Sequence, residues 1–112
     1  MARQNYLGEL EQMVLWAVLR LDGDGYGTTI LEALTGRVER RVTPGALYAT
    51  LDRLEEKGMI QSRLADAEAG RGGRRKRYLT VTSDGRVALD RTRQEWMRMW
   101  DGVDAVPDAK GS

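Results

Sequence analysis

The chain has 112 residues, of which 41% are hydrophobic and 31% are charged, proportions typical of one small soluble domain. It contains neither cysteine nor histidine, which excludes disulfides, thiol nucleophiles, the usual zinc sites and histidine-based catalysis. We therefore expect no enzyme, no metal and no cofactor. Apolar runs are too short for a membrane helix, and acids interrupt the N-terminal apolar stretch, so we expect a cytoplasmic protein without membrane contact.

Positive charge is concentrated in the middle of the chain, although the formal net charge is only +1. Residues 37–63 carry 6 cations and 4 acids, and residues 64–78 carry 5 cations and 2 acids. Residues 1–36 and 79–112 are each net negative. A local positive field of this kind can attract nucleic acid despite a nearly neutral total.

The first predicted helix covers residues 7–21. Apolar residues recur along it from Leu7 at the i, i+3, i+4, i+7 spacing of a core-facing side. Tyr6, Met13 and Trp16 fall on another side. This second apolar side is either part of a wide core stripe or a dimer interface.

The next segment begins with the turn signal "DGDG" at residues 22–25. A short second helix is predicted over residues 26–37, with Gly36 as its C-terminal stop. Residues 37–42 are too few and too charged for an independent element. We expect them to form a short edge strand or a linker.

The third predicted helix has the clearest end signals and lies in "TPGALYATLDRLEEKGMI", residues 43–60. Thr43 is a typical N-cap, Pro44 occupies the first helical position and Gly58 ends the helix. Leucines at i, i+4 and i+7 form a buried stripe. The opposite side suits close approach to another surface, because it presents small residues and one aromatic: Gly45, Tyr48, Ala49, Asp52 and Arg53. An alternative role for Tyr48 is to cover the edge of the core.

Two strands are predicted at residues 59–64 and 76–81, on either side of a glycine-rich loop. Thr82 then caps a final helix that runs from about residue 83 to residue 103. This helix has a heptad-like stripe with two tryptophans, more than a small core can cover, so we expect it to pack on a partner subunit. The tail, residues 106–112, is expected to be disordered.

This order of elements predicts a mainly α fold with a small β-hairpin. It corresponds to a winged helix-turn-helix domain in residues 1–82, followed by a C-terminal dimerisation helix in residues 83–105. In such domains the third helix enters the major groove and the hairpin follows the DNA backbone or the minor groove. The predicted DNA-binding residues are Thr43, Gly45, Tyr48, Ala49, Arg53, Arg71, Arg74, Arg75, Lys76 and Arg77.

The hairpin cations have alternative interpretations. A nucleotide cradle needs GxxxxGK[ST] or GxGxxG, and the glycines at 70, 72 and 73 fit neither pattern. A solvated charge run remains an alternative, as does a winged helix that contacts protein or RNA without binding an operator. Because side chains alternate along a strand, not all of these cations can face DNA together.

Several motifs resemble those of the PadR-like transcriptional regulators, over roughly residues 7–100. "TPGALYATLDRLEEKGMI" is similar to the family's helix-three pattern Ser/Thr-x-Gly-x-Leu-Tyr-x-x-Leu-x-x-Leu-Glu-x-x-Gly. "GGRRKRYLTVTSDG" is similar to its wing pattern, and "GYG" at 25–27 to its Gly-Tyr signature. Two departures are Gly27, where the family usually has an acid, and a compressed wing in which Thr82 takes the place of the family's threonine.

The resemblance implies a homodimer whose first and last helices form the dimer surface and whose wings reach the halves of a palindromic operator in double-stranded DNA. It also implies a repressor of a transporter or detoxification gene that a small molecule releases. Planar aromatic compounds bind at the dimer interface of some short-tailed relatives with a single C-terminal helix. The ligand-binding residues implied here are Trp96, Tyr6, Met13 and Trp100, and the predicted dimer residues are Leu7, Trp16, Leu89, Trp96, Met99, Trp100 and Val103. Alternatively, the tryptophans only stabilise the dimer.

Overall fold

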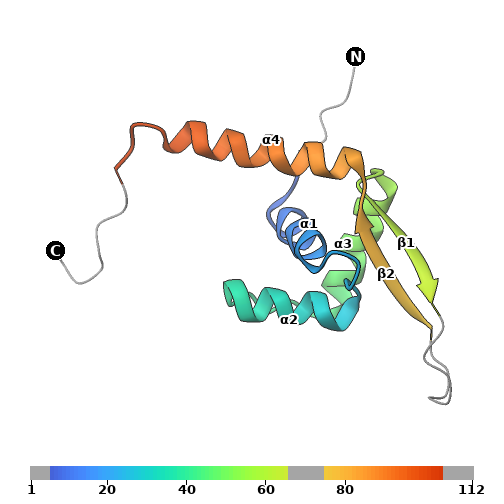
Figure 1. Ribbon diagram of the computed structural model, residues 1–112. Helices are drawn as coiled ribbons and strands as arrows, with labels where there is room; N and C mark the ends of the chain where they lie inside the picture. The colour runs from blue at the N-terminus through green and yellow to red at the C-terminus, as the bar shows by residue number, and fades with distance from the viewer. Residues whose placement is uncertain (1–5, 66–74, 105–112) are drawn as a thin grey trace.

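The computed structural model describes residues 6–65 and 75–104. Its elements are α1 (Glu9–Leu21), α2 (Gly27–Val38), α3 (Pro44–Glu56), β1 (Ile60–Ala65), β2 (Lys76–Val81) and α4 (Ser83–Trp100). Figure 1 shows α1, α2 and α3 packed together, the hairpin on one flank, and α4 crossing over α1 and continuing beyond the other helices. The predicted mainly α fold with a small hairpin is confirmed.

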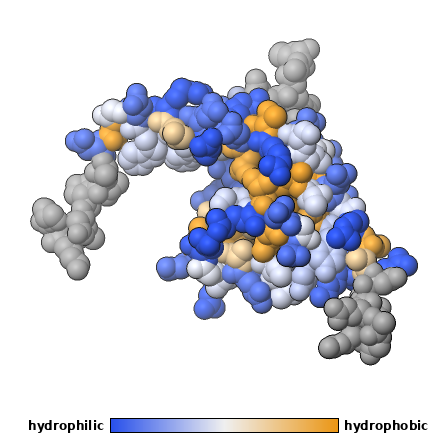
Figure 2. All heavy atoms as spheres, viewed as in Figure 1, coloured by the Kyte–Doolittle hydropathy of each residue, from blue (hydrophilic) through white to orange (hydrophobic). Residues whose placement is uncertain are grey.

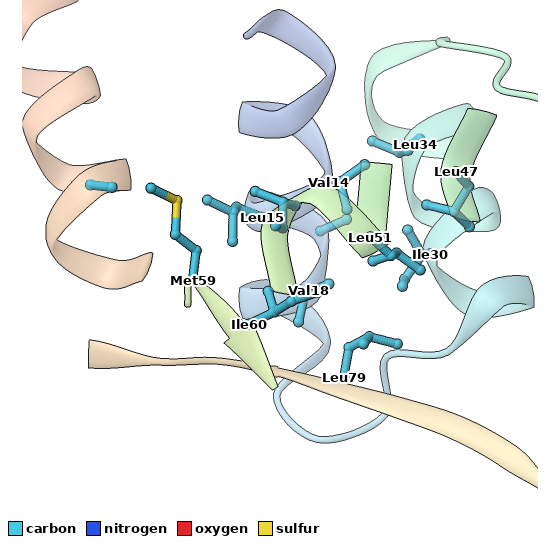
Figure 3. Packing of buried hydrophobic residues seen from close by; sticks show 13 residues of the cluster. Val14, Leu15, Val18, Ile30, Leu34, Leu47, Leu51, Met59, Ile60 and Leu79 are labelled. Atoms are coloured by element: carbon cyan, nitrogen blue, oxygen red, sulfur yellow. The ribbon is translucent and has the colours of Figure 1, made fainter. Parts of the chain in front are cut away.

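The hydrophobic core is built around α1, which contacts α2, α3, β2 and α4. Val14, Leu15, Ala17 and Val18 of α1 are buried in it (Figure 3). The leucines of α3 that were predicted as a buried stripe are also fully enclosed: Leu47, Leu51 and Leu54. Burying one such side chain contributes about 1.5–3 kcal/mol, so this stripe is a main reason why α3 docks where it does.

The second side of α1 is partly covered by the chain's own core. Met13 and Trp16 are partly buried and pack against the core cluster, as does Leu7 just before the helix. Tyr6 is exposed. The wide-stripe interpretation therefore holds for much of this side, and a part of each side chain stays accessible.

The end of α2 differs from the prediction. The helix continues through Gly36 to Val38 and ends at Glu39, which has a left-handed backbone with φ 55°. The amides of Glu39 and Arg40 donate to the carbonyls of Thr35 and Leu34, which closes the helix without a glycine. Gly36 is thus an interior position, and residues 39–43 form a linker with no strand.

Residues 39–42 form the linker that was one of the two expectations for residues 37–42, and a different segment lies beside the sheet. Gly25, in the turn between α1 and α2, forms an antiparallel bridge with Leu79 of β2. The Leu79 amide donates to the Gly25 carbonyl at 2.8 Å. The turn after α1 therefore lies along the edge of the two-stranded sheet and ties the base of the hairpin to the helices.

The ends of α3 match the sequence signals. The Thr43 hydroxyl accepts a hydrogen bond from the Ala46 amide at 3.1 Å, and Pro44 opens the helix. Gly58 follows the helix with φ 75°, a conformation that favours glycine. The chain then enters β1, which pairs with β2 from Ile60–Val81 to Ala65–Lys76.

The start of α4 is fixed to the turn between α3 and β1. The Thr82 hydroxyl accepts from the Gly85 amide at 3.0 Å and donates to the Gly58 carbonyl at 2.6 Å. Gly85 is buried, and a Cβ built on it would collide with the Met59 carbonyl oxygen. Close packing of this first turn therefore requires glycine. The helix ends at Trp100, three residues earlier than predicted.

Candidate nucleic-acid interface

The first half of α3 presents a surface with short side chains. Gly45 and Ala49 are exposed, and Tyr48 beside them is 46% exposed. The Tyr48 ring rests on the start of α2, where a Cβ built on Gly27 would lie 2.6 Å from the Tyr48 hydroxyl oxygen. Gly27 thus makes room for Tyr48, which gives the departure from the family pattern a structural reason. The surface allows the helix backbone to approach another molecule closely.

The second half of α3 is acidic, and Arg77 of β2 is paired with it. The Arg77 Nη2 atom lies 2.7 Å from Glu55 Oε1 and 3.4 Å from Asp52 Oδ1. Ser62 of β1 donates to the other Glu55 oxygen at 3.0 Å. The Arg77 hydrogen bond, followed by that of Ser62, lowers the pKa of the Glu55 carboxyl. This cation therefore links the hairpin to α3.

The opposite face of the hairpin carries cations stacked on tyrosines. The Arg63 guanidinium lies 4.8 Å from the ring centre of Tyr78, which is its cross-strand partner. The Lys76 ammonium lies 4.4 Å from the ring centre of Tyr26, and the two tyrosine rings meet edge to face at 5.3 Å. Such contacts contribute about 0.5–1 kcal/mol each at exposed sites and hold the cations in place. This face presents fixed positive charge towards the loop end of the hairpin.

Arg63 was missed by the sequence prediction, which took cations only from the second half of the hairpin. The available signal was strand pairing. Residues opposite each other in antiparallel strands share a face, so a cation across from Tyr78 belongs with Lys76. Assigning it required the register, which the sequence alone did not provide.

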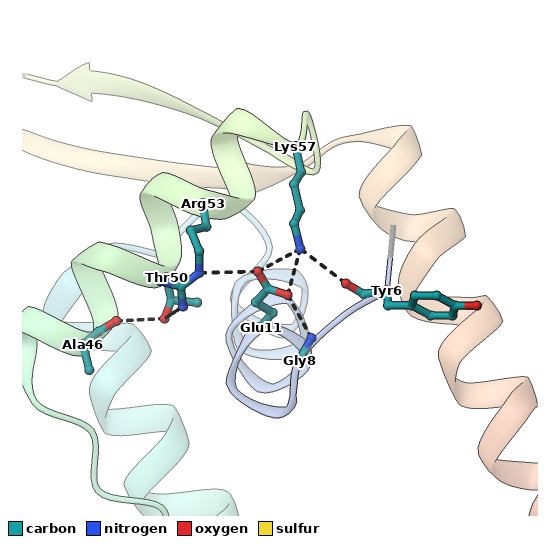
Figure 4. Close-up of polar contacts among 7 residues, drawn as sticks. All are labelled: Tyr6, Gly8, Glu11, Ala46, Thr50, Arg53 and Lys57. Carbon is teal, nitrogen blue, oxygen red and sulfur yellow. Dashed lines mark hydrogen bonds and ion pairs between the residues drawn. The ribbon is translucent and has the colours of Figure 1, made fainter. Parts of the chain in front are cut away.

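A buried carboxylate joins α1 to the end of α3 (Figure 4). The Glu11 side chain is 8% exposed and accepts from the Gly8 amide at 2.8 Å and from Lys57 Nζ at 3.0 Å. Arg53 Nε lies 3.6 Å from it, and Arg53 also donates to the Thr50 hydroxyl at 3.2 Å. Arg53, predicted to contact DNA, is therefore held through its guanidinium group by Glu11 and Thr50, although its side chain stays 54% exposed.

The pKa of the Glu11 carboxyl is lowered by this arrangement. Burial acts in the opposite direction and would raise it. The hydrogen bonds from Gly8 and Lys57, together with the charges of Lys57 and Arg53, outweigh burial. The carboxylate is therefore charged at neutral pH and secures the C-terminal end of α3 to the start of α1.

The other predicted DNA-binding residues are placed as follows. Arg71 and Arg74 lie outside the described residues, as does the tail at 106–112. Arg75 is exposed at the start of the hairpin's second half. Thr43 uses its hydroxyl to cap α3. The start of α2 connects the first half of α3 with the hairpin, because Tyr48 lies against Gly27 and Lys76 lies over the ring of Tyr26.

A second surface lies between α1 and α4. A cavity of about 620 Å³ opens there, and its walls come from α1, the end of α2 and α4: Gln12, Met13, Trp16, Leu19, Val38, Arg86, Leu89, Asp90, Thr92 and Arg93. Figure 2 shows hydrophobic residues gathered where α4 leaves the rest of the domain. Of the residues implied for ligand binding, Met13 lines this cavity. Tyr6, Trp96 and Trp100 are exposed outside it.

The outer half of α4 continues the apolar stripe that its first half buries. Gly85 and Ala88 are buried against the domain, and Leu89 is packed on the core. Trp96 and Trp100 follow at spacings of 7 and 11 from Leu89, which return to the same side of a helix. Trp96 is 51% exposed, and Met99, Trp100 and Val103 are also exposed. The described part of the chain leaves this stripe without a covering surface.

The helix order, the paired hairpin and the exposed first half of α3 define a winged helix-turn-helix protein. Residues 15–91 match the model of the "Transcriptional regulator PadR-like family". The chain therefore belongs to the PadR-like family, whose members are transcriptional regulators and not enzymes. An uncharacterised protein of Lysinibacillus sphaericus is 30% identical over 99 residues, which cover 87% of this chain and 86% of that protein.

Solved structures show the same fold. A PadR family transcription regulator from Clostridium difficile R20291 superposes with a TM-score of 0.71 at 28% identity, covering 84% of this chain and 93% of its own. Bacillus subtilis PadR, crystallised in complex with operator DNA, gives a TM-score of 0.62 at 19% identity. That match covers 92% of this chain and 53% of the Bacillus protein. No helix among residues 6–65 and 75–104 is both long and apolar enough to cross a membrane.

Proposed function

We propose that this regulator is a homodimeric repressor that binds a palindromic operator in double-stranded DNA through α3 and the wing, which is the hairpin of β1 and β2. The observation that carries the proposal is the exposed first half of α3, which the start of α2 links to the hairpin cations, since Tyr48 lies against Gly27 and Lys76 over the Tyr26 ring. Gly45 and Ala49 allow the helix into the major groove, and Tyr48 and Arg53 flank them with groups able to contact bases or phosphates. Lys76 and Arg75 supply charge to the adjoining backbone.

The homodimer is supported by the outer half of α4. Its exposed tryptophans and methionines continue the stripe that the first half of the helix buries, so burying them requires another surface. A second copy of the chain supplies both a matching α4 and the apolar cavity beside α1. A two-fold axis through such an interface places two copies of α3 for the two halves of a palindromic site.

Relief by a small planar aromatic ligand is supported by the cavity beside α1. Its volume of about 620 Å³ lies within the range of about 300–1,000 Å³ that small-molecule sites occupy. Met13 and Trp16 line it, while Trp96 and Trp100 lie farther along α4. In a dimer, the tryptophans of one copy can complete the cavity of the other. The regulated gene would then encode a transporter or a detoxification enzyme that handles the ligand.

DNA binding is tested by fluorescence anisotropy with a duplex from the chain's own promoter region and a scrambled duplex. We expect tighter binding to the promoter, with two chains per site and an affinity that falls steeply with salt. Changing Arg74 and Arg75 together to Ala should weaken binding to both duplexes. Tyr48→Ala should act mainly on the promoter duplex, by about 1–3 kcal/mol if the ring contacts a base. Absence of any salt-dependent preference for the promoter would contradict the proposal.

Ligand binding is tested by tryptophan emission with a panel of planar cations and phenolic acids. A ligand should quench wild-type emission, release the operator and lose its effect in Trp96→Phe. Unchanged emission across the panel would contradict the ligand part of the proposal and leave the DNA part standing. Repression itself is measured with a reporter under the same promoter, which should be more active in cells that lack the protein.

A further inference from the structure

We propose that Arg77 is a positioning residue of the DNA-binding surface and not one of its phosphate contacts. It neutralises the acidic half of α3 and fixes the wing against that helix. The inference rests on the proposed binding of DNA through α3 and the wing. It gives Arg77 a different role from Arg75 and Lys76, together with which it was predicted from the sequence as a DNA-binding residue.

The strand face on which Arg77 lies supports this role. Along β2, Leu79 is buried against the core, and Arg77 shares its face because side chains alternate. Lys76 and Tyr78 point to the other side, where Tyr78 meets Arg63. Arg77 is therefore directed at α3, and its side chain is only 27% exposed.

The guanidinium is already engaged by two carboxylates one helical turn apart. Nη2 lies 2.7 Å from Glu55 and 3.4 Å from Asp52. Ser62, on the adjacent strand, holds the second Glu55 oxygen at 3.0 Å. Both strands of the hairpin thus attach to the same carboxylate of α3. We call these contacts of Arg77 and Ser62 with Glu55 and Asp52 the junction, and the angle between the wing and α3 depends on it.

The charge balance of α3 gives the junction a function. Asp52, Glu55 and Glu56 lie on the exposed side of the second half of α3, whose first half is proposed to enter the groove. Uncompensated carboxylates so close to DNA repel phosphates. A cation held between Asp52 and Glu55 offsets this repulsion without releasing a DNA counterion, because it replaces none at a phosphate.

A double-mutant cycle on DNA affinity tests the inference. Arg77→Met is measured alone and together with Asp52→Asn and Glu55→Gln, with the acid-only double variant as reference. We expect Arg77→Met to weaken operator binding about tenfold in the wild-type background, because two acids are uncovered and the wing is released. In the Asp52→Asn/Glu55→Gln background the same change should have almost no effect. The slope of log affinity against log salt should stay unchanged.

A different outcome is expected if Arg77 contacts a DNA phosphate. A phosphate contact would give the same loss in both backgrounds and would reduce the salt slope by about one. Either observation overturns the inference. Arg63→Met, on the other hairpin face, is the comparison for a background-independent loss. Arg91→Met, an exposed charge on α4, controls for the removal of one cation and should leave affinity unchanged.

The contact between Arg77 and Glu55 is also tested in the protein without DNA. This measurement can contradict the proposed contact independently of whether the protein binds DNA. The Glu55 carboxyl pKa, followed by NMR, should rise towards its ordinary value in Arg77→Met. An unchanged Glu55 pKa would overturn the junction whether or not DNA binds. If wild-type protein binds no DNA, the proposed function fails and the positioning role fails with it. Should Arg77→Met not fold, Arg77→Gln enters the same cycle.

Discussion

Replacing Glu11 by Gln removes the charge of a carboxylate that joins separate parts of the chain. Its partners are the Gly8 amide at 2.8 Å, Lys57 at 3.0 Å and Arg53 at 3.6 Å. A hydrogen bond to a charged group contributes about 1.5–3 kcal/mol when buried, and less where a partner reaches water. Lys57 and Arg53 are 30% and 54% exposed, so we expect a loss of about 1–3 kcal/mol for the whole cluster.

The effect of Glu11→Gln should depend on pH in one direction. Because the pKa of Glu11 is lowered on folding, its contribution is complete above the ordinary value of 4.5 and is lost as pH falls through the lowered value. The difference in unfolding free energy between wild type and Glu11→Gln should therefore be constant from about pH 6 to pH 8. It should shrink below pH 4.5 and disappear once Glu11 is protonated.

Urea unfolding followed by circular dichroism, at one fixed protein concentration, measures this difference. Glu9→Gln is the matched control, because Glu9 lies on the same turn of α1. It is 71% exposed and has a 3.1 Å ion pair with Arg40. We expect Glu9→Gln to change stability by less than about 0.5 kcal/mol. Equal effects of the two substitutions, or a Glu11 effect that is unchanged at pH 4, would refute the reasoning.

Gly85→Ala should destabilise the protein by about 1–3 kcal/mol in the same assay, because the new Cβ meets the Met59 carbonyl. Gly36→Ala, within α2 and with nothing near its built Cβ, should instead be neutral or stabilise by up to about 1 kcal/mol, and the reverse order would contradict the packing. Thr82→Val removes both hydrogen bonds at the start of α4 and should cost about 1–2 kcal/mol by urea titration. Trp96→Ala should shift sedimentation towards monomer at micromolar concentration while the circular dichroism spectrum is retained, whereas an unchanged dimer would place the interface elsewhere.

Features with local causes were predictable from the sequence. The start of α3 follows from Thr43 and Pro44, whose capping and first-turn preferences act within a few residues. The start of α4 at Thr82 has the same local origin. The end of α2 was not predictable in this way. Glycine adopts the left-handed conformation that ends many helices more easily than other residues, so the sequence pointed to Gly36. In the structure Glu39 adopts this conformation instead.

The sequence indicated candidate residues for the site and did not indicate which partners they meet. Strand alternation indicated that the hairpin cations do not all face one way. Which carboxylates Arg77 meets depends on how the hairpin lies against α3, and this is decided by packing of the core. Glu11 shows the same limit, because its burial arises only when the end of α3 and the segment before α1 converge on it.

The bridge between Gly25 and Leu79 has a consequence for the order in which the chain can fold. These two residues are 54 positions apart, and Leu79 belongs to the same buried cluster as α1. During synthesis, the helices α1 to α3 are complete before the segment that closes their core has left the ribosome. The apolar surfaces of these helices are therefore not fully covered until β2 has been synthesised, and α4 is the next element after β2. A chain interrupted between β1 and β2 would expose the core side of α1, so stable folding requires that β2 has been synthesised.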